Sequence, residues 1–287
     1  MGSKMSAIPV LETIAPLGPS ADVWLLDIWG VLHNGIKPFA SAVTACITFR
    51  KAGGQVILVS NSPRPCDGVI AQLNGIGVDP SSYDAVITSG DVSRGLIVDT
   101  ANRPALHIGP ARDLPLFDGL GVKLVDMDRA EVILCTGLYD DEHESPLNYA
   151  DQLQQLYARG MPMICANPDV KAERGGKIIY CAGAIAQAYE ALGGEVAYAG
   201  KPHAPIYNAA LDIAARVCGR RIEKGRVLAI GDGVATDIRG ASNIGIRSVY
   251  VASAVNLARG TQLSDAADAL FANEAVKPIG VMTALTW

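Results

Sequence analysis

Short apolar runs alternate with amphipathic segments of helical length along most of the chain. Short apolar runs bounded by turn residues are typical of buried strands in a parallel sheet. Apolar positions at helical spacing predict helices at 41–51, before Gly53 and Gly54, and at 205–218, which opens with a proline. The predicted strands are 23–26, 55–60, 85–88, 105–108, 130–135, 161–166, 196–199, 226–230 and 248–251.

This alternation of strands and helices predicts an α/β fold with a doubly wound, right-handed parallel sheet. The chain has 287 residues, of which 49% are hydrophobic, enough for one large domain or two modest ones. Polar stretches at 100–104, 140–145 and 193–195 are candidate crossings between domains. Composition alone does not choose among them.

Charge and cysteine usage narrow the class of protein. The net charge of −5 does not favour nucleic acid as a partner, although a metal ion could neutralise a phosphorylated small molecule locally. No apolar run approaches the ~20 residues that span a bilayer, and the N-terminus lacks the pattern of a signal peptide. The six cysteines form no C-x-x-C pair, which favours reduced thiols in a cytoplasmic protein over a zinc site or disulfides.

Asp27 ends the first predicted strand, directly after the buried run 23–26. Open α/β sheets bind ligands beyond the carboxyl ends of their strands, so Asp27 is a candidate catalytic residue. Taken alone, Asp27 is equally consistent with a structural residue that caps the turn after the strand. Three later stretches change that balance.

The second strand ends in Ser60, followed by Asn61 and Ser62. A hydroxyl and successive backbone N–H groups at a strand end can hold a phosphate oxygen, although in isolation the string is typical of an ordinary turn. Lys201 follows the run 196–199 and precedes a helix. A lysine is a compact point charge suited to phosphate or carboxylate, or else a solvated surface residue; the flanking prolines stiffen its loop.

Two further carboxylates follow the strand 226–230. Asp232 comes directly after Gly231, and Asp237 follows five residues later across a turn that contains Gly233. Two carboxylates at such a turn, meeting a third from a neighbouring strand, would make an oxygen-rich site of the kind that Mg²⁺ prefers.

The order of these four motifs resembles the haloacid dehalogenase superfamily of hydrolases: strand-Asp, strand-Ser, Gly-Lys-Pro and strand-Gly-Asp-x4-Asp. The long interval between Ser60 and Lys201 is similar to that of the class IIA branch, which includes NagD-like nucleotide phosphatases and pyridoxal phosphate phosphatase. The string Ala166-Asn167-Pro168-Asp169 and the string Gly200-Lys201-Pro202 are similar to strings of that branch.

The resemblance implies a Rossmann-like core with an inserted α/β cap. The core would comprise residues 1–100 and 197–287, and the cap residues 101–196. The family also implies cap–cap dimers in this branch, so a homodimer is among the expected states. The cap would set specificity through Asn167 and Asp169, and Asn61 of the core is also expected to bind the substrate.

The resemblance further implies Mg²⁺-dependent removal of phosphate from a small metabolite, of nucleotide, sugar phosphate or pyridoxal phosphate type. Asp27 would be the nucleophile, forming a covalent aspartyl phosphate, and also a metal ligand. Ser60 and Lys201 would hold the transferring phosphoryl oxygens. Asp232, Asp237 and the backbone carbonyl of Trp29 would complete the metal site.

Trp29 is the departure from the family pattern. Most phosphatases of the family carry there a second Asp, the general acid/base, whose assistance is typically worth ~10²–10⁴-fold in rate. Indole exchanges no proton in this pH range. The sequence therefore predicts slow turnover, a good leaving group or a substitute such as His33. Two alternatives stay open: a dehalogenase-like hydrolase, since dehalogenases carry an aromatic residue there, and a catalytically weak binder of phosphometabolites.

Overall fold

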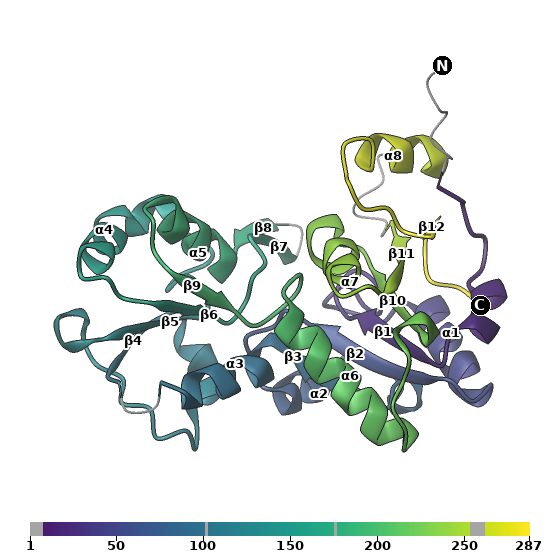
Figure 1. Ribbon diagram of the computed structural model, residues 1–287, viewed down its shortest axis with the longest axis horizontal. Coiled ribbons are helices and arrows are strands. Elements are labelled where there is room, and N and C mark those ends of the chain that lie inside the picture. The colour runs from purple at the N-terminus through teal and green to yellow at the C-terminus, as the bar shows by residue number, and fades with distance from the viewer. Residues whose placement is uncertain (1–7, 101–102, 175–176, 253–261) are drawn as a thin grey trace. The chain divides into compact units, whose positions relative to one another are not determined.

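The computed structural model describes residues 8–100, 103–174, 177–252 and 262–287 (Figure 1). These residues form two compact units. The first comprises the described residues within 1–59, 72–86 and 207–287, and the second comprises those within 60–71 and 87–206. Each segment of the second unit thus lies between two segments of the first in chain order, and the described residues of the predicted cap, 101–196, all belong to the second unit. Among the described residues, no helix is long and apolar enough to cross a bilayer.

The first sheet has six strands in the order β12-β11-β10-β1-β2-β3. The pairs whose register is described are all parallel. The chain leaves β1 towards β2 on one side and returns to β10 on the other, so the strand order reverses beside β1. The strands are β1 (Val23–Asp27), β2 (Gln55–Ser60), β3 (Ala85–Thr88), β10 (Val227–Gly231), β11 (Arg247–Val251) and β12 (Gly280–Met282).

Helices connect these strands, as the sequence pattern predicts. The α-helices are α1 (Ala40–Lys51), α2 (Cys66–Gly75), α6 (Ala204–Cys218), α7 (Arg239–Asn243) and α8 (Leu263–Leu270). Shorter turns are η1 (Ala15–Ser20), η2 (Pro80–Ser82), η6 (Lys224–Arg226) and η7 (Val234–Ile238). All five residues of β1 and of β10 are buried, which explains why these strands are uninterrupted apolar runs.

The second unit holds a parallel sheet in the order β4-β5-β6-β9. Its strands are β4 (Ala105–Ile108), β5 (Val132–Cys135), β6 (Met163–Cys165) and β9 (Val196–Tyr198). Apolar residues of α4 (Ala150–Ala158) and α5 (Ala182–Ala191) pack in one core cluster with the sheet. Residues of α3 (Ser89–Val98) and η3 (Ala111–Phe117) pack in another, so both faces are covered. The turns η4 (Met127–Arg129) and η5 (Pro146–Tyr149) complete the unit.

The predicted fold class, a doubly wound α/β core with an inserted α/β domain, is confirmed. All nine predicted strands are present, with shifts of one or two residues at some ends. The sequence missed the antiparallel hairpin β7 (Lys171–Arg174) and β8 (Lys177–Tyr180), because its charged residues interrupt any apolar run. It also missed β12, which has only three residues. The six cysteines are free thiols, as expected.

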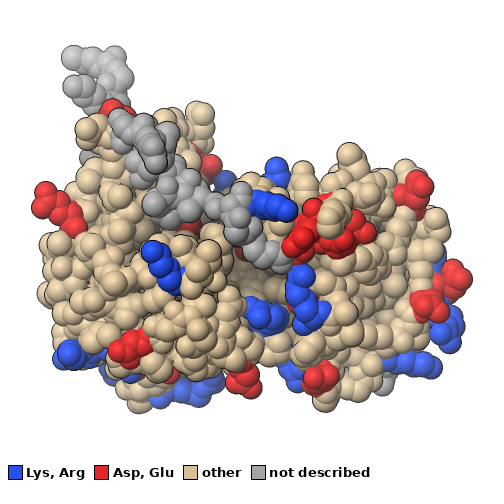
Figure 2. Space-filling view, turned by 180° about the vertical axis from the view of Figure 1, so that it is seen from behind, with Lys and Arg blue, Asp and Glu red and all other residues tan. Residues whose placement is uncertain are grey.

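The face of the protein shown in Figure 2 carries acidic and basic side chains interspersed, with neither sign of charge alone.

An aromatic stack fixes α1 against β1. The rings of Trp24 and Phe49 lie 4.0 Å apart and within 4° of parallel, and Trp287 packs at an angle to both. Both Trp24 and Phe49 are almost fully buried. A Cβ at Gly54 would lie 2.3 Å from the Phe49 ring, so that residue must stay small. The stack therefore anchors the strand that carries Asp27.

Truncating this stack should destabilise the first unit strongly. We expect Phe49→Ala to lower the free energy of unfolding by ~3–5 kcal/mol, because it leaves a large cavity in a closely packed core. Ile36→Ala is the control, since Ile36 is 72% exposed and its loss should change stability by less than ~0.5 kcal/mol. Urea unfolding followed by tryptophan fluorescence measures both. Equal midpoints for the two variants would contradict the role of the stack.

A half-buried histidine is expected to give the second unit a pH-dependent stability. His107, in β4, has its Nε2 within 2.9 Å of Thr136 Oγ1, and its ring packs edge-on against Phe117. Burial lowers the pKa of His107 from 6.5 to about 4. Between these values the unfolded chain binds a proton that the folded chain does not, so the free energy of unfolding falls as the pH falls.

Replacing this histidine should flatten the acid side of the stability profile. For His107→Gln, the loss of unfolding free energy between pH 7 and pH 4.5 should shrink by on the order of 1 kcal/mol, a value discounted for partial exposure. Urea unfolding at a series of pH values measures it. Above pH 6.5 the imidazole is neutral in both states, so the two proteins should show parallel profiles there. Parallel profiles below pH 6.5 as well would refute the assignment.

Candidate active site

The first group of predicted site residues lies where the strand order of the six-stranded sheet reverses. Asp27 is the last residue of β1, and Asp232 directly follows the last residue of the neighbouring strand β10. The two strands pair in parallel, with Leu26 opposite Ile230. Their carboxyl ends therefore bring both carboxylates to one edge, at the point where open α/β sheets bind ligands.

Three carboxylates converge there. Oxygen atoms of Asp27, Asp232 and Asp237 all lie within 4.8 Å of one another. Asp27 and Asp237 are 8% and 5% exposed, so water can screen their repulsion only weakly. An oxygen-only donor set of this charge suits a hard divalent cation such as Mg²⁺. The three aspartates predicted as metal ligands are thus brought together by the fold.

Backbone and side-chain donors orient Asp237. Its Oδ2 accepts hydrogen bonds from the Gly233 N–H at 3.1 Å and from the Thr236 hydroxyl at 3.3 Å. The hydroxyl of Tyr207, in α6, donates towards the backbone carbonyls of Thr236 and Asp237. Sequence reasoning missed Thr236 and Tyr207. The position of Thr236 beside Asp237 was the available signal, whereas nothing along the chain links Tyr207 to this loop.

Glycines let the carboxylates approach the backbone. Gly30 has a φ of +83°, and a Cβ there would lie 2.0 Å from Asp232 Oδ2. A Cβ at Gly231 would lie 2.1 Å from Cγ of Asp237. Both positions therefore need glycine for space, and Gly30 needs it for its conformation as well.

Trp29 and His33 belong to the turn after β1. The two residues form an isolated bridge, and the Gly30 N–H donates to the His33 carbonyl at 2.9 Å. His33 is 3% exposed, and its Nδ1 accepts the Gly35 N–H at 2.7 Å. Burial lowers the pKa of His33 to about 4. His33 is therefore a buried, structurally engaged imidazole, which argues against it as a substitute acid/base.

The second group of predicted site residues is joined by hydrogen bonds within the second unit. The Asn61 side chain bonds the backbone N–H and C=O of Lys201, at 2.7 and 3.0 Å, and donates to Asp169 Oδ1 at 2.8 Å. Lys201 is 3% exposed, so it is not the solvated surface residue considered from the sequence, and Asn61 is 4% exposed.

Ser60 and Asn167 shape the loops on either side of this group. Ser60 Oγ accepts the Ser62 N–H at 3.1 Å, a bond that leaves the serine's own proton available for donation. Asn167 Oδ1 accepts the Asp169 N–H at 3.1 Å, so its side chain stabilises the loop that carries Asp169. These contacts are local, and neither assigns a substrate contact to Ser60 or Asn167.

Comparison with known proteins identifies the family. A model described as haloacid dehalogenase-like hydrolase matches residues 24–123, and one described as HAD-hydrolase-like matches residues 198–275. A crystal structure of a haloacid dehalogenase-like hydrolase from Brucella suis is 43% identical over 96% of this chain and 100% of its own, with a TM-score of 0.87. The chain belongs to the haloacid dehalogenase-like hydrolases. The resemblance to this superfamily that was seen in the sequence is confirmed.

Other solved structures share the fold at lower identity. A 4-nitrophenylphosphatase from Thermotoga maritima is 21% identical over 93% of this chain and 96% of its own, with a TM-score of 0.69. A glycerol phosphate phosphatase from Mycobacterium tuberculosis, in complex with magnesium, is 22% identical over 94% and 77%, with a TM-score of 0.68. Comparison with curated proteins gave no match.

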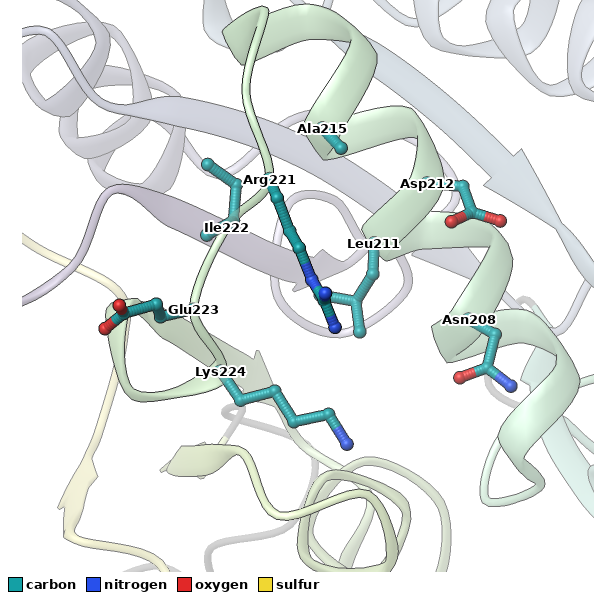
Figure 3. Close-up of a pocket in the computed structure, with 8 residues that line it drawn as sticks. All are labelled: Asn208, Leu211, Asp212, Ala215, Arg221, Ile222, Glu223 and Lys224. Carbon is teal, nitrogen blue, oxygen red and sulfur yellow. The ribbon is translucent and has the colours of Figure 1, made fainter.

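A separate hollow of about 780 Å³ lies in the first unit, between α6 and the segment that leads into β10 (Figure 3). Its apolar floor includes Leu211 and Ile222, and charges of both signs surround it. None of the predicted site residues of this hydrolase lines it. The full lining is Asn208, Leu211, Asp212, Ala215, Arg221, Ile222, Glu223 and Lys224.

The glycine at position 30 offers a test of the candidate metal site. Gly30→Ala should weaken Mn²⁺ binding by at least ~10-fold, because the new methyl group displaces the Asp232 carboxylate. Gly53→Ala is the matched control. Gly53 also has a positive φ, of +95°, but has nothing within 4 Å of an added Cβ.

Both variants should lose ~1 kcal/mol or more of stability from backbone strain, while only Gly30→Ala loses metal affinity. Titration with Mn²⁺, followed by water-proton relaxation, separates the two effects. Equal Mn²⁺ affinity in both variants would remove Asp232 from the metal site.

Proposed function

We propose that this protein is a Mg²⁺-dependent phosphatase that removes phosphate from a small phosphorylated metabolite through an aspartyl phosphate on Asp27. The observation that carries the proposal is the cluster of Asp27, Asp232 and Asp237 at the strand-order reversal. Three carboxylates so close together repel one another, and a cation bound among them would relieve that repulsion. A cation there would neutralise the charge of an approaching phosphate and so allow a carboxylate to attack it.

The reaction runs in two displacements on this proposal. A carboxylate oxygen of Asp27 attacks phosphorus, the bond from phosphorus to the leaving oxygen breaks, and that oxygen departs with the electron pair and takes up a proton. Water then attacks the phosphorus of the aspartyl phosphate. The phosphorus–oxygen bond to Asp27 breaks, inorganic phosphate leaves and the carboxylate is regenerated.

Ser60 and Lys201 hold the phosphoryl oxygens in this scheme. The Ser60 hydroxyl retains its proton for donation, and the Lys201 ammonium offsets negative charge on the transferring group. Burial of Lys201 strengthens that electrostatic contribution, because water screens it less than a surface lysine.

Trp29 restricts the substrates that this chemistry can use. Most phosphatases of the family carry an aspartate at that position, which gives a proton to the departing oxygen. Trp29 cannot supply that proton. Esters whose leaving group is stable as an anion are therefore favoured over alkyl phosphates. Dehalogenation is disfavoured, because it does not need the carboxylate pair of Asp232 and Asp237.

Residues 101–196, which belong to the second unit, act as the cap on this proposal and select the leaving group. The loop with Asn167 and Asp169 is the proposed part that faces the substrate. The named activities of two structural neighbours, 4-nitrophenylphosphatase and glycerol phosphate phosphatase, support phosphate esters as the substrate class, and the magnesium complex of the latter supports the choice of metal.

Phosphate release from p-nitrophenyl phosphate and from alkyl phosphates tests the proposal. Wild-type activity should require Mg²⁺ and should favour the p-nitrophenyl ester. Asp27→Asn should reduce kcat by ~10³-fold or more, because an amide is not a nucleophile here. Asp79→Asn is the control, since Asp79 caps a turn at an exposed position.

Trp29→Asp separates the alternatives that the sequence leaves open. It should raise kcat for alkyl phosphates by ~10²-fold while changing p-nitrophenyl phosphate hydrolysis much less, because only the alkoxide needs the proton. Activity confined to Trp29→Asp would instead identify the natural protein as a phosphometabolite binder. Wild-type activity that survives Asp27→Asn and chelation of Mg²⁺ would exclude the aspartyl-phosphate route.

A further inference from the structure

The Asn61 side-chain amide bonds both the backbone N–H and the backbone C=O of Lys201, as a residue of a neighbouring strand would in a β-sheet. Asn61 Oδ1 accepts the Lys201 N–H at 2.7 Å, and Asn61 Nδ2 donates to the Lys201 carbonyl at 3.0 Å. A primary amide presents one acceptor and two donors in one plane, so it can match both backbone groups of a single residue. The reversed amide orientation would bring two donors together and two acceptors together, so this network fixes it.

A third bond extends the pairing to the loop that carries Asp169. The remaining Nδ2 hydrogen of Asn61 donates to Asp169 Oδ1 at 2.8 Å. Both Nδ2 hydrogens are then used, and the side chain is 4% exposed. A hydrogen bond to a carboxylate is stronger than one between neutral groups. Asn61 therefore joins three segments that lie far apart in sequence: 60–62, 167–169 and 200–202.

The packing around this junction leaves no room for a second arrangement. A Cβ at Gly200 would lie 2.4 Å from Asn61 Oδ1, 2.8 Å from Pro168 Cδ and 2.8 Å from Ser89 Oγ. The backbone before Lys201 thus lies directly against the amide. An unpaired buried donor or acceptor is costly, so loss of the amide cannot be absorbed by simple rearrangement.

We propose that Asn61 is a positioning residue that holds the backbone of Lys201 beside Ser60 and couples it to Asp169. This replaces the direct substrate contact expected for Asn61 from the sequence, because the side chain is already engaged. The inference rests on the proposed function, in which Ser60 and Lys201 bind the phosphoryl group. It also gives Asp169 a role. A change in the conformation of the 167–169 loop would shift the Asn61 side chain, and through it the backbone of Lys201.

Exchanging the two side chains tests the coupling. Asn61→Asp keeps the acceptor for the Lys201 N–H but turns a carboxylate towards Asp169 and the Lys201 carbonyl, so kcat/KM for p-nitrophenyl phosphate should fall ~100-fold. Asp169→Asn alone should cost less than ~10-fold. The double variant N61D/D169N restores a donor and an acceptor across the pair and should recover at least ~10-fold over Asn61→Asp.

Two readouts separate positioning from substrate contact and from general damage. Inhibition by inorganic phosphate should weaken in Asn61→Ala in parallel with the fall in kcat/KM, since the phosphate-binding lysine is displaced. Hydrogen exchange at the Lys201 amide should accelerate in the same variant. Asn148→Ala is the control: it removes an exposed asparagine that accepts a backbone N–H in the same unit, and should change neither readout.

The outcomes are distinguishable. Should the wild type release no phosphate while Lys201 exchange still accelerates in Asn61→Ala, the proposed function fails and the bonding arrangement stands. Unchanged exchange, or a double variant no better than Asn61→Asp, overturns the positioning role. If Asn61→Ala raises KM for the ester but leaves inhibition by inorganic phosphate unchanged, Asn61 contacts the leaving group directly instead.

Discussion

Repulsion among three carboxylates is the constraint on which the first unit of this hydrolase is built. Oxygen atoms of Asp27, Asp232 and Asp237 within 4.8 Å of one another would favour separation if nothing compensated their charge. The parallel register of β1 and β10 holds Asp27 and Asp232 at one edge, and donors from Gly233 and Thr236 hold Asp237. The buried sheet supplies the rigidity, and on the proposed function the carboxylates would bind a cation.

The close approach of backbone and carboxylates explains at which positions a larger side chain is not tolerated. At Gly30 and Gly231 a methyl group would collide with a carboxylate, whereas at Gly53 it would meet nothing. The Trp24–Phe49 stack acts further from the edge, by fixing α1 on the strand that ends in Asp27. The site thus depends on glycines that let the carboxylates lie against the backbone, and on an aromatic stack that holds β1 in place. These residues come from different parts of the chain.

The fold and the carboxylate cluster could be predicted from sequence because both follow from local patterns. A buried parallel strand is an apolar run, and its carboxyl end is the next polar residue, so Asp27 and Asp232 could be placed without coordinates. The contacts of Tyr207 and Asn61 could not be predicted, because they join residues that lie far apart along the chain. Asn61 meets Lys201 across 140 positions. The hairpin β7–β8 was missed for another reason, namely that paired edge strands rich in charge have no apolar signature.

Trp29 shows how separable the components of such a site are. On the proposed function, electrostatic stabilisation would need the carboxylates, a cation bound by them and Lys201, and none of these depends on the side chain at position 29. Proton delivery to the leaving oxygen needs that side chain or a substitute, and buried His33, whose Nδ1 accepts the Gly35 N–H, is a poor one. On the proposed function the protein therefore keeps the contribution that makes attack on phosphorus feasible and lacks the one that widens the range of leaving groups. Selectivity for substrates would then arise from the missing acid as much as from the shape of the cap.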